Sequence, residues 1–511
     1  MSTSVSPSND RSFFGHPKGL GLLFMTEMWE RFSYYGLRPL LVLFMAAALA
    51  DGGFGFERPQ ASAIVGIYAA CVYLASLPGG WIADRWLGLR RAILIGAVLI
   101  TAGHLAIGVS GFAGESIGKP FFFLGLVLIV LGTGLLKPNI SAIVGDLYPE
   151  GGARRDAGFS IFYMGINTGA FIGQLVTGYL GERVSWHWGF GAAGIGMAFG
   201  LVSFWLGARK FLGTIGQDIV RDPDPAVQAK REATVRTTTL AGLAVLALVF
   251  VLAATGTVAL DPQAIGGAMT FVLVGIAVAF FAYIFSFGGL TSDEKKRSAV
   301  IFVLFVFAAI FWAAFEQAPT SLQLFANDFT DRNLFGFEVP ATWFQTVNSA
   351  FIIIMSPVFA ALWVAMAKRS IDLSSPSKFA LGLALAGVGF LLMVFAANTV
   401  VATGGRVLVS PWWLIASYFF QTCGELFLSP VGLSSMTTLS PRRYVGQMMG
   451  IWFLAASVGN LVAGLVGGHV DPTKLEQTPA VFSGTAIALF VATALLGVMI
   501  VPIRKMMAGV R

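Results

Sequence analysis

The chain has 511 residues, of which 56% are hydrophobic and only 12% are charged. A soluble globular chain carries about 25% charged residues, so the composition excludes an ordinary soluble protein. The net charge of +7 does not indicate a nucleic-acid partner, because most Lys and Arg residues fall in alternate loops between apolar runs. The two cysteines, Cys71 and Cys423, lie inside apolar runs, which excludes a disulfide framework.

Apolar runs of about 20 residues recur along the chain, and each is long enough to cross the hydrocarbon core of a bilayer. We therefore expect an all-α membrane protein of about fourteen transmembrane helices. The polar N-terminal segment lacks a short apolar core with a cleavage site, so the first span is expected to be retained. The predicted spans are 19–50, 61–83, 91–111, 119–146, 156–180, 188–209, 237–258, 267–287, 298–325, 341–367, 376–397, 410–437, 443–469 and 478–503.

Two comparable six-helix halves remain when the central pair of spans is treated as an insertion. Parallel six-helix halves are the architecture of the major facilitator superfamily. The asymmetry of Lys and Arg between loops predicts that both termini are cytoplasmic. The inserted helices carry no charge in mid-span, so we expect them to be peripheral and to face lipid. The predicted segments are a cytoplasmic tail 1–18, an N-terminal bundle 19–210, a cytoplasmic linker 211–236, the insertion 237–290, a C-terminal bundle 291–505 and a cytoplasmic tail 506–511.

The first span carries an unusual cluster of ionisable residues. Glu27, Glu30 and Arg31 are spaced i, i+3 and i+4, so they share one helical face and can partly neutralise one another. Tyr34 and Arg38 follow on nearly the same face. A charge at the centre of a spanning helix costs roughly 2.5–3.5 kcal/mol on insertion scales. This polar stripe is therefore predicted to face a cavity or the protein interior, not lipid.

The loop after the second span contains a second motif. Gly80, Asp84 and Arg85 form a G-x-x-x-D-R pattern that is followed by Gly88 and a basic pair. The pattern resembles the corresponding loop of the major facilitator superfamily. Its alternative explanation is a charged cytoplasmic turn that satisfies the positive-inside rule.

Three later spans carry one charge each, namely Lys137, Glu316 and Glu425. In a six-plus-six arrangement, the helices of Arg38 and Glu316 are equivalents, and so are those of Lys137 and Glu425. Ion pairs between Arg38 and Glu316, and between Lys137 and Glu425, could bridge the halves. They would open when the acid is protonated or the base receives a substrate carboxylate. Because arginine stays charged, the acids must carry the protons. The alternative is a set of structural ion pairs that hold the helices in register.

Aromatic and amide side chains near these charges could complete a binding site. The tyrosine and tryptophan rings could form pocket walls with polar tips, and an amide inside a span can both donate to and accept from a peptide backbone. For each aromatic residue taken alone, core packing or an interfacial belt is the alternative. The candidates are Tyr34, Tyr35, Tyr68, Trp312, Trp452, Asn167 and Asn348.

Several of these motifs together resemble one family. The run Glu27-x-x-Glu30-Arg31-Phe32-x-Tyr34-Tyr35-Gly36 is similar to the signature of the proton-coupled oligopeptide transporters, which are peptide:proton symporters of the major facilitator superfamily. The run Phe162-Tyr163-x-x-Ile166-Asn167-x-Gly169 resembles the second signature of that family. Lys137-Pro138-Asn139, Glu316-Gln317 and Gly424-Glu425-x-x-x-Ser429-Pro430 resemble further landmarks. The two-helix insertion is typical of bacterial members.

The resemblance implies proton-driven import of di- and tripeptides, and possible transport of peptide-like drugs, across a bacterial inner membrane by alternating access. It implies no cofactor or metal apart from protons as the coupling ion. The second helix lacks the histidine of animal members, so coupling should rest on carboxylates alone. The implied proton-coupling residues are Glu27, Glu30, Arg31, Lys137 and Glu316; the implied substrate-binding residues are Tyr35, Arg38, Tyr68, Lys137, Asn167, Trp312, Glu316, Asn348, Glu425, Ser429 and Trp452.

Two other functions are alternatives to peptide symport. The first is another transporter of the same superfamily, carrying a drug, an amino acid or nitrate. The intact Glu-x-x-Glu-Arg run argues against nitrate, since the plant members that transport nitrate lack this run. The second is an intramembrane enzyme. It is disfavoured because the chain has no His-Glu-x-x-His helix and no Gly-x-Ser-x-Gly elbow.

Overall fold

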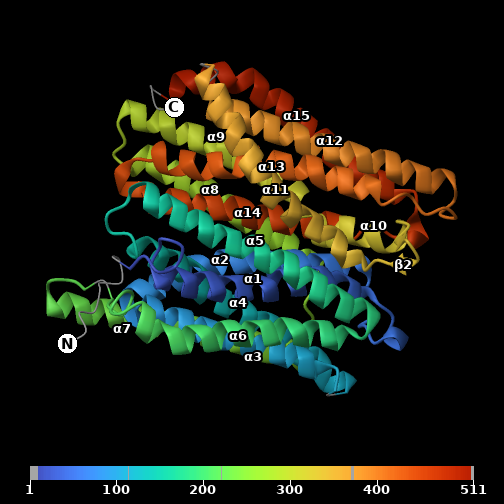
Figure 1. Ribbon diagram of the computed structural model, residues 1–511, viewed down its shortest axis with the longest axis horizontal. Helices are drawn as coiled ribbons and strands as arrows, with labels where there is room; N and C mark the ends of the chain where they lie inside the picture. The colour runs from blue at the N-terminus through green and yellow to red at the C-terminus, as the bar shows by residue number, and fades with distance from the viewer. Residues whose placement is uncertain (1–9, 113, 220, 370–372, 508–511) are drawn as a thin grey trace. The chain divides into compact units, whose positions relative to one another are not determined.

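The structure is a computed structural model that describes residues 10–112, 114–219, 221–369 and 373–507. The outer parts of both predicted tails, 1–9 and 508–511, lie outside the described residues. Within these residues the chain is almost entirely helical, with fourteen α-helices of 22 residues or more (Figure 1). Twelve of the helices are long and apolar enough to cross a membrane. The predicted all-α major facilitator fold is confirmed.

The helix bounds follow the predicted spans closely. The first helix is missing from the twelve apolar spans because Glu27, Glu30 and Arg31 interrupt it. The helices are α1 (Lys18–Ala46), α2 (Arg58–Ile82), α3 (Leu89–Ser110), α4 (Glu115–Asp146), α5 (Gly152–Arg183), α6 (Trp186–Phe211), α7 (Pro225–Ala254), α8 (Pro262–Phe287), α9 (Ser292–Phe315), α10 (Gln323–Asp328), α11 (Thr346–Lys368), α12 (Ser375–Ala402), α13 (Trp412–Thr438), α14 (Val445–Gly467) and α15 (Gln477–Met506); a small hairpin joins β1 (Asn333–Leu334) to β2 (Phe337–Glu338).

The chain forms two compact units. Unit 1 contains residues 1–40 and 71–260, and unit 2 contains residues 41–70 and 261–511. The end of α1, the connection that follows it and the first half of α2 therefore belong with the second unit. The inserted helix pair is divided in the same way, with α7 in unit 1 and α8 in unit 2.

Unit 1 is built from helices that approach one another through glycine. In this unit α3 packs on α4 and α6 (Figure 1). The helix α5 also packs on α4 and α6. A Cβ atom placed on Gly79 of α2 would lie 1.9 Å from the carbonyl oxygen of Gly134 on α4. One placed on Gly169 of α5 would lie 2.0 Å from the carbonyl oxygen of Met28 on α1. Small residues at such crossings allow close backbone contact, which drives helix association in lipid.

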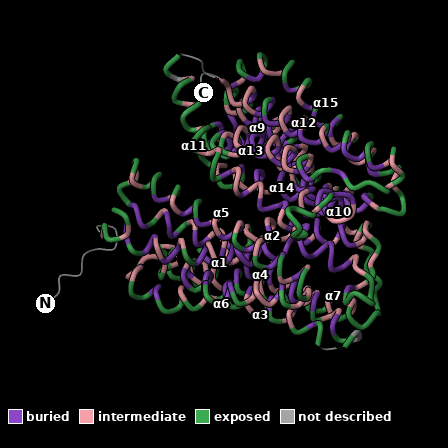
Figure 2. The backbone as a smooth tube through the Cα atoms, turned by 45° about the vertical axis from the view of Figure 1, so that its right-hand side comes forward, coloured by how far each residue is buried: buried purple, intermediate pink, exposed green. Residues whose placement is uncertain are grey.

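Unit 2 is centred on α14, where 67% of the residues in the most apolar 18-residue stretch are buried (Figure 2). In this unit α14 packs on α8, α9 and α13, while α12 packs on α13 and α15. The first half of α2 joins the same unit, where Gly66 meets the backbone of Gly464 on α14. At the start of α2, Arg58 pairs with Asp328 and donates a hydrogen bond to the carbonyl oxygen of Val470 at 3.0 Å. These contacts anchor the connection between α1 and α2 to unit 2.

The helix α7 begins earlier than the hydropathy pattern predicts. The carboxylate of Asp224 caps it by accepting a hydrogen bond from the backbone N–H of Ala226 at 2.8 Å, with Pro225 in the first turn. The second half of the polar segment predicted as a linker, from Pro225 onward, is therefore helical. Val235 is the one buried residue of this helix. In the most apolar 18-residue stretch of the helix, no residue is buried (Figure 2). The apolar part of α7 is thus open to surrounding lipid.

The predicted span 298–325 is broken in the structure. The helix α9 ends at Phe315, and a π-helical turn, η4 (Ala318–Leu322), separates it from α10. Pro319 lies in this turn and has no N–H to donate, which prevents a regular continuation of α9. Irregular backbone at membrane depth is tolerated where it is buried in protein or lines a cavity, so the break marks a site of interest.

The close crossing of α2 and α4 gives a matched test of glycine packing. Gly79→Ala should lower the free energy of unfolding by about 1–3 kcal/mol, because its methyl group would overlap the Gly134 carbonyl and force the helices apart. Gly80→Ala is the control, since its Cβ would meet nothing nearer than 3.9 Å. Thermal unfolding of the two purified variants in detergent measures the difference. Equal midpoints would contradict this account of the crossing.

Candidate substrate and proton site

The predicted charge cluster of α1 is assembled in unit 1. The Nε atom of Arg31 lies 3.1 Å from Oε1 of Glu27 and 2.5 Å from Oε2 of Glu30. All three side chains are buried, with at most 3% of their surface exposed. A single guanidinium group therefore faces two carboxylates in an environment where an unpaired charge is costly.

Three of the four carboxylate oxygens of this cluster lack a hydrogen-bond donor among the described residues. Among the described residues, Oε2 of Glu27 and both oxygens of Glu30 accept no hydrogen bond, although the charge of Arg31 is close to them. A buried carboxylate oxygen without a donor loses the free energy of its hydration shell. The charge of Arg31 therefore has to offset the missing donors.

Aromatic rings extend the α1 cluster toward Arg38. The ring of Tyr34 lies under both guanidinium groups, with its centroid 5.3 Å from Cζ of Arg31 and 6.0 Å from Cζ of Arg38. Tyr35 packs edge-on against Tyr34 and is half-buried. The helical spacing that places these side chains on neighbouring faces thus yields a continuous stripe of cations and aromatic rings along α1.

Lys137 lies on α4 in the same unit. Its ammonium group sits over the ring of Tyr73 on α2, 4.4 Å from the ring centroid, and interacts electrostatically with Glu27. The side chain is half-buried, as Tyr73 is. Sequence reasoning missed Tyr73, because an aromatic residue in an apolar helix gives no signal of its partner. The structure therefore adds a cation–π contact to the site.

Asn167 on α5 also belongs to unit 1. Its amide donates a hydrogen bond to the carbonyl oxygen of Tyr163 on the same helix, at 3.1 Å, and 6% of the residue is exposed. The side chain is thus held against its own helix by a local bond. An amide carries two N–H donors and a carbonyl acceptor, so further hydrogen-bonding capacity remains for a ligand.

Glu316 belongs to unit 2 and caps the broken end of α9. The next residue, Gln317, donates to the hydroxyl of Thr485 at 3.0 Å and accepts from the hydroxyl of Ser321 at 2.7 Å. These bonds fix the backbone where α9 changes into η4. The carboxylate of Glu316 is consequently held at an irregular point of the helix, with 5% of the residue exposed.

Glu425 on α13 forms the second acidic centre of unit 2. The amide of Asn348 on α11 donates to Oγ1 of Thr422 at 2.9 Å and to Oε2 of Glu425 at 3.5 Å. Glu425 also interacts electrostatically with Glu316, so the structure brings these two acids near each other. Glu425 and Asn348 are both half-buried, and Ser429 follows one turn later on α13. This group is accessible enough to meet a ligand.

The two predicted tryptophans of unit 2 are packed against glycine. A Cβ atom on Gly459 of α14 would lie 2.4 Å from Cβ of Trp312, and one on Gly432 of α13 would overlap the ring of Trp452. Trp312 is 9% exposed and Trp452 is 6% exposed. Tyr68, in the first half of α2, is also buried within unit 2. Core packing accounts for much of the surface of these three residues.

The predicted residues thus fall into two chemically different groups. Unit 1 holds the cations Arg31, Arg38 and Lys137 together with Glu27 and Glu30, and unit 2 holds the acids Glu316 and Glu425. Unit 1 can bind a carboxylate, and unit 2 can bind an ammonium group.

Comparison with known proteins identifies the family. A model of the POT family matches residues 90–481. The chain belongs to the POT family. It is 48% identical to the peptide transporter YePEPT of Yersinia enterocolitica, with 99% of this chain and 98% of the relative aligned. It is 36% identical to the di-/tripeptide transporter of Lactococcus lactis subsp. cremoris, over 98% of this chain and 99% of the relative.

Solved structures of the POT family have the same fold. A crystal structure of a mutant POT peptide transporter in complex with alafosfalin matches with a TM-score of 0.87 and 40% identity, covering 99% of this chain and 98% of that one. The sequence resemblance to the proton-coupled oligopeptide transporters is therefore confirmed, and this POT family member is a peptide transporter.

The contact between Lys137 and Tyr73 predicts a specific effect on transport. Tyr73→Leu should weaken peptide uptake by roughly 2- to 30-fold at low peptide concentration, because a cation–π contact contributes about 0.5–2 kcal/mol. Tyr73→Phe, which keeps the ring, should retain most of the uptake. Initial rates over a range of dialanine concentrations in proteoliposomes distinguish the two variants. If the Leu variant behaved like the wild type, the ring would have no role in placing Lys137.

Proposed function

We propose that this POT family member imports di- and tripeptides together with protons by alternating access, and that Glu27, Glu30, Arg31, Lys137 and Glu316 handle the protons. The observation that carries the proposal is the buried group in which one arginine faces two carboxylates. Both termini are proposed to be cytoplasmic, and the distribution of Lys and Arg supports this orientation. Protons are the coupling ion, and no other cofactor is involved.

Coupling follows from the shared charges of unit 1. With both acids ionised, the cluster of Glu27, Glu30 and Arg31 carries one net negative charge, and Lys137 supplies a further positive charge that interacts with Glu27. A peptide carboxylate that engages Lys137 removes part of that countercharge. A proton on Glu27 then restores neutrality. By linkage, protonation of Glu27 favours peptide binding to the same extent as peptide binding favours protonation.

The substrate is recognised through its two charged ends. Arg38 and Lys137 are proposed to bind the peptide carboxylate through charge-assisted hydrogen bonds. Glu425 is proposed to bind the amino terminus, assisted by the amides of Asn348 and Asn167 and by Glu316. The remaining proposed contacts line the side-chain pockets and come from Tyr35, Tyr68, Trp312, Ser429 and Trp452.

Peptide-like drugs are proposed as further substrates. The mutant POT transporter at 40% identity is in complex with alafosfalin, so a closely similar fold accepts that compound. Recognition of two opposite charges does not demand a particular side chain. A compound that presents an ammonium group and an anionic group at a similar distance should therefore compete with a dipeptide.

Replacing Glu27 tests the coupling step. Glu27→Gln keeps the shape of the side chain but removes the titratable group, so uptake of labelled dialanine against its gradient should be lost under an imposed pH gradient. Exchange of internal for external dialanine should persist, because Arg38 and Lys137 are intact. Both activities are measured in the same proteoliposomes. Glu476→Gln, a substitution outside the spans, is the control and should accumulate peptide normally.

Concentrative uptake by the Glu27→Gln protein would remove Glu27 from the coupling mechanism. Loss of both accumulation and exchange would instead place Glu27 in substrate binding or folding. Size-exclusion chromatography of the purified variant separates these two possibilities.

Replacing the residues that bind the peptide ends tests the substrate class. Lys137→Ala and Glu425→Ala should each reduce dialanine uptake by at least 10-fold, because a lost charged hydrogen bond costs about 1.5–3 kcal/mol. Glu425→Gln keeps the contact with Asn348 but not the charge, and it should be nearly as defective. Unimpaired uptake by the Gln variant would show that the amino terminus is bound elsewhere.

If dialanine and alafosfalin failed to compete for uptake, the drug proposal would be wrong.

A further inference from the structure

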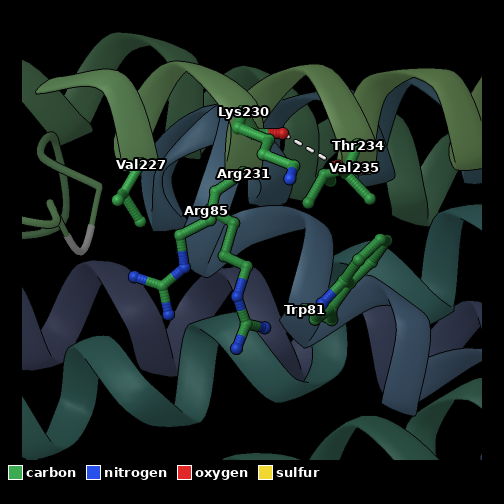
Figure 3. Close-up of a pocket in the computed structure, with 7 residues that line it drawn as sticks. All are labelled: Trp81, Arg85, Val227, Lys230, Arg231, Thr234 and Val235. Atoms are coloured by element: carbon green, nitrogen blue, oxygen red, sulfur yellow. Dashed lines mark hydrogen bonds between the residues drawn. The ribbon is translucent and has the colours of Figure 1, made fainter.

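A pocket of about 320 Å³ lies within unit 1, between the end of α2 and the first turns of α7. The turn η3 (Ala83–Leu87), which follows α2, packs against α7 at this point. The proposed function does not use any residue that lines this pocket. Its lining residues are Trp81, Arg85, Val227, Lys230, Arg231, Thr234 and Val235 (Figure 3).

All the charged residues that line this pocket are cations. Arg85 lies over the ring of Trp81, with Cζ 5.9 Å from the ring centroid. Arg231 pairs with Asp222 at 3.1 Å, while Lys230 forms no ion pair with any described residue. Figure 3 shows the two guanidinium groups and the ammonium group around one space. Three cations at a single pocket repel one another, and an anion there would relieve this repulsion.

The pocket adjoins a surface that is open to lipid. The polar start of α7 ends near Arg236, and the helix then continues with exposed apolar side chains. Leu240 is 51% exposed, Val245 is 62% exposed and Leu248 is 59% exposed. At 1.5 Å per residue, the first of these lies roughly 8 Å along the helix from Val235. One ligand could therefore place an anionic group in the pocket and an apolar chain along α7.

We propose that this pocket binds the phosphate group of an anionic phospholipid, whose acyl chains lie along the exposed apolar face of α7. Guanidinium groups bind phosphate oxygens through paired hydrogen bonds, and lysine binds them as a point charge. Basic pockets beside transmembrane helices on the cytoplasmic side are typical sites for anionic lipid headgroups. The orientation that puts the pocket on this side is the one proposed above from the distribution of Lys and Arg.

The lipid would supply contacts that α7 lacks. Val235 is the one buried residue of this 30-residue helix, and it lies in the pocket wall. A headgroup that bridges Arg85 on η3 to Lys230 and Arg231 on α7 would hold the inserted helix on unit 1. The same phosphate chemistry is present in free inorganic phosphate, but that ion offers nothing to the apolar surface beyond Arg236. The lipid is therefore the proposed ligand.

Native mass spectrometry of the full chain in detergent tests the proposal. The protein is titrated with phosphatidylglycerol, with zwitterionic phosphatidylcholine of the same acyl chains, and with inorganic phosphate. The wild type should bind phosphatidylglycerol more tightly than phosphatidylcholine. Each cation removed should weaken this binding by roughly fivefold, so the double variant Lys230→Gln/Arg231→Gln should lose most of the preference.

Arg236→Gln is the matched control, because Arg236 lies on the same polar segment of α7 but does not line the pocket. It should keep the preference for phosphatidylglycerol. An equal loss in the control would show that surface charge in general attracts the lipid, and the proposal would be wrong. Inorganic phosphate that bound as tightly as the lipid and displaced it would identify the free ion as the ligand and also overturn the proposal.

A preference for phosphatidylglycerol that the double variant retained would place the lipid elsewhere on the protein. Thermal unfolding of each variant without lipid confirms that a weakened binder is folded. None of these measurements uses peptide, so their failure would leave the proposed transport function untouched. Failure of dialanine uptake would likewise not affect the lipid site.

Discussion

The structure depends on keeping Arg31 between two carboxylates inside an apolar helix. An isolated ion at this depth would destabilise α1, yet Arg31 lies 3.1 Å from Glu27 and 2.5 Å from Glu30, with all three side chains buried. The compensation is incomplete, since one cation meets two acids. The cluster therefore responds to any charge that approaches or leaves it. Lys137 is such a charge, and in the proposed mechanism a peptide carboxylate bound to Lys137 is another.

This arrangement requires that the surrounding helices approach closely and exclude water. The backbone of α5 meets that of α1 at Gly169, two residues beyond Asn167, and α2 meets α4 at Gly79 and Gly134, one turn from Lys137. A larger side chain at either crossing would separate the helices and admit solvent beside the ions. Water would then screen the charges and weaken their mutual influence. Close glycine packing thus maintains the interaction between the buried charges, because it keeps water out.

Much of the fold and of the charge cluster could be predicted from the sequence, because both follow from helical periodicity and the cost of buried charge. Glu27, Glu30 and Arg31 share a face at any helix orientation, so their contact needed no tertiary information. Tyr73 was not predicted. It lies five residues after the predicted Tyr68 on α2, so the two side chains point in directions about 140° apart and do not share a face. Only the packing of α2 on α4 shows that the ring of Tyr73 lies under Lys137.

The break after Phe315 and the early start of α7 were missed for a related reason. Apolar residues lie on both sides of the break, so averaged hydropathy reports one span across it, although Pro319 removes a donor within it. The start of α7 is polar, so hydropathy reports a linker where the cap of Asp224 begins a helix. In both places local backbone chemistry decided the structure, and an average over about 20 residues concealed it.

The division of the inserted helices between the units gives them a physical role. Because α7 belongs to unit 1 and α8 to unit 2, the insertion is not a separate body, and each helix would move with the unit on which it packs. The helix α8 packs on α9 and α14, whereas α7 has little buried surface beyond its contact with η3. The cationic pocket at η3 is the place where the proposed lipid would add a contact between α7 and its unit.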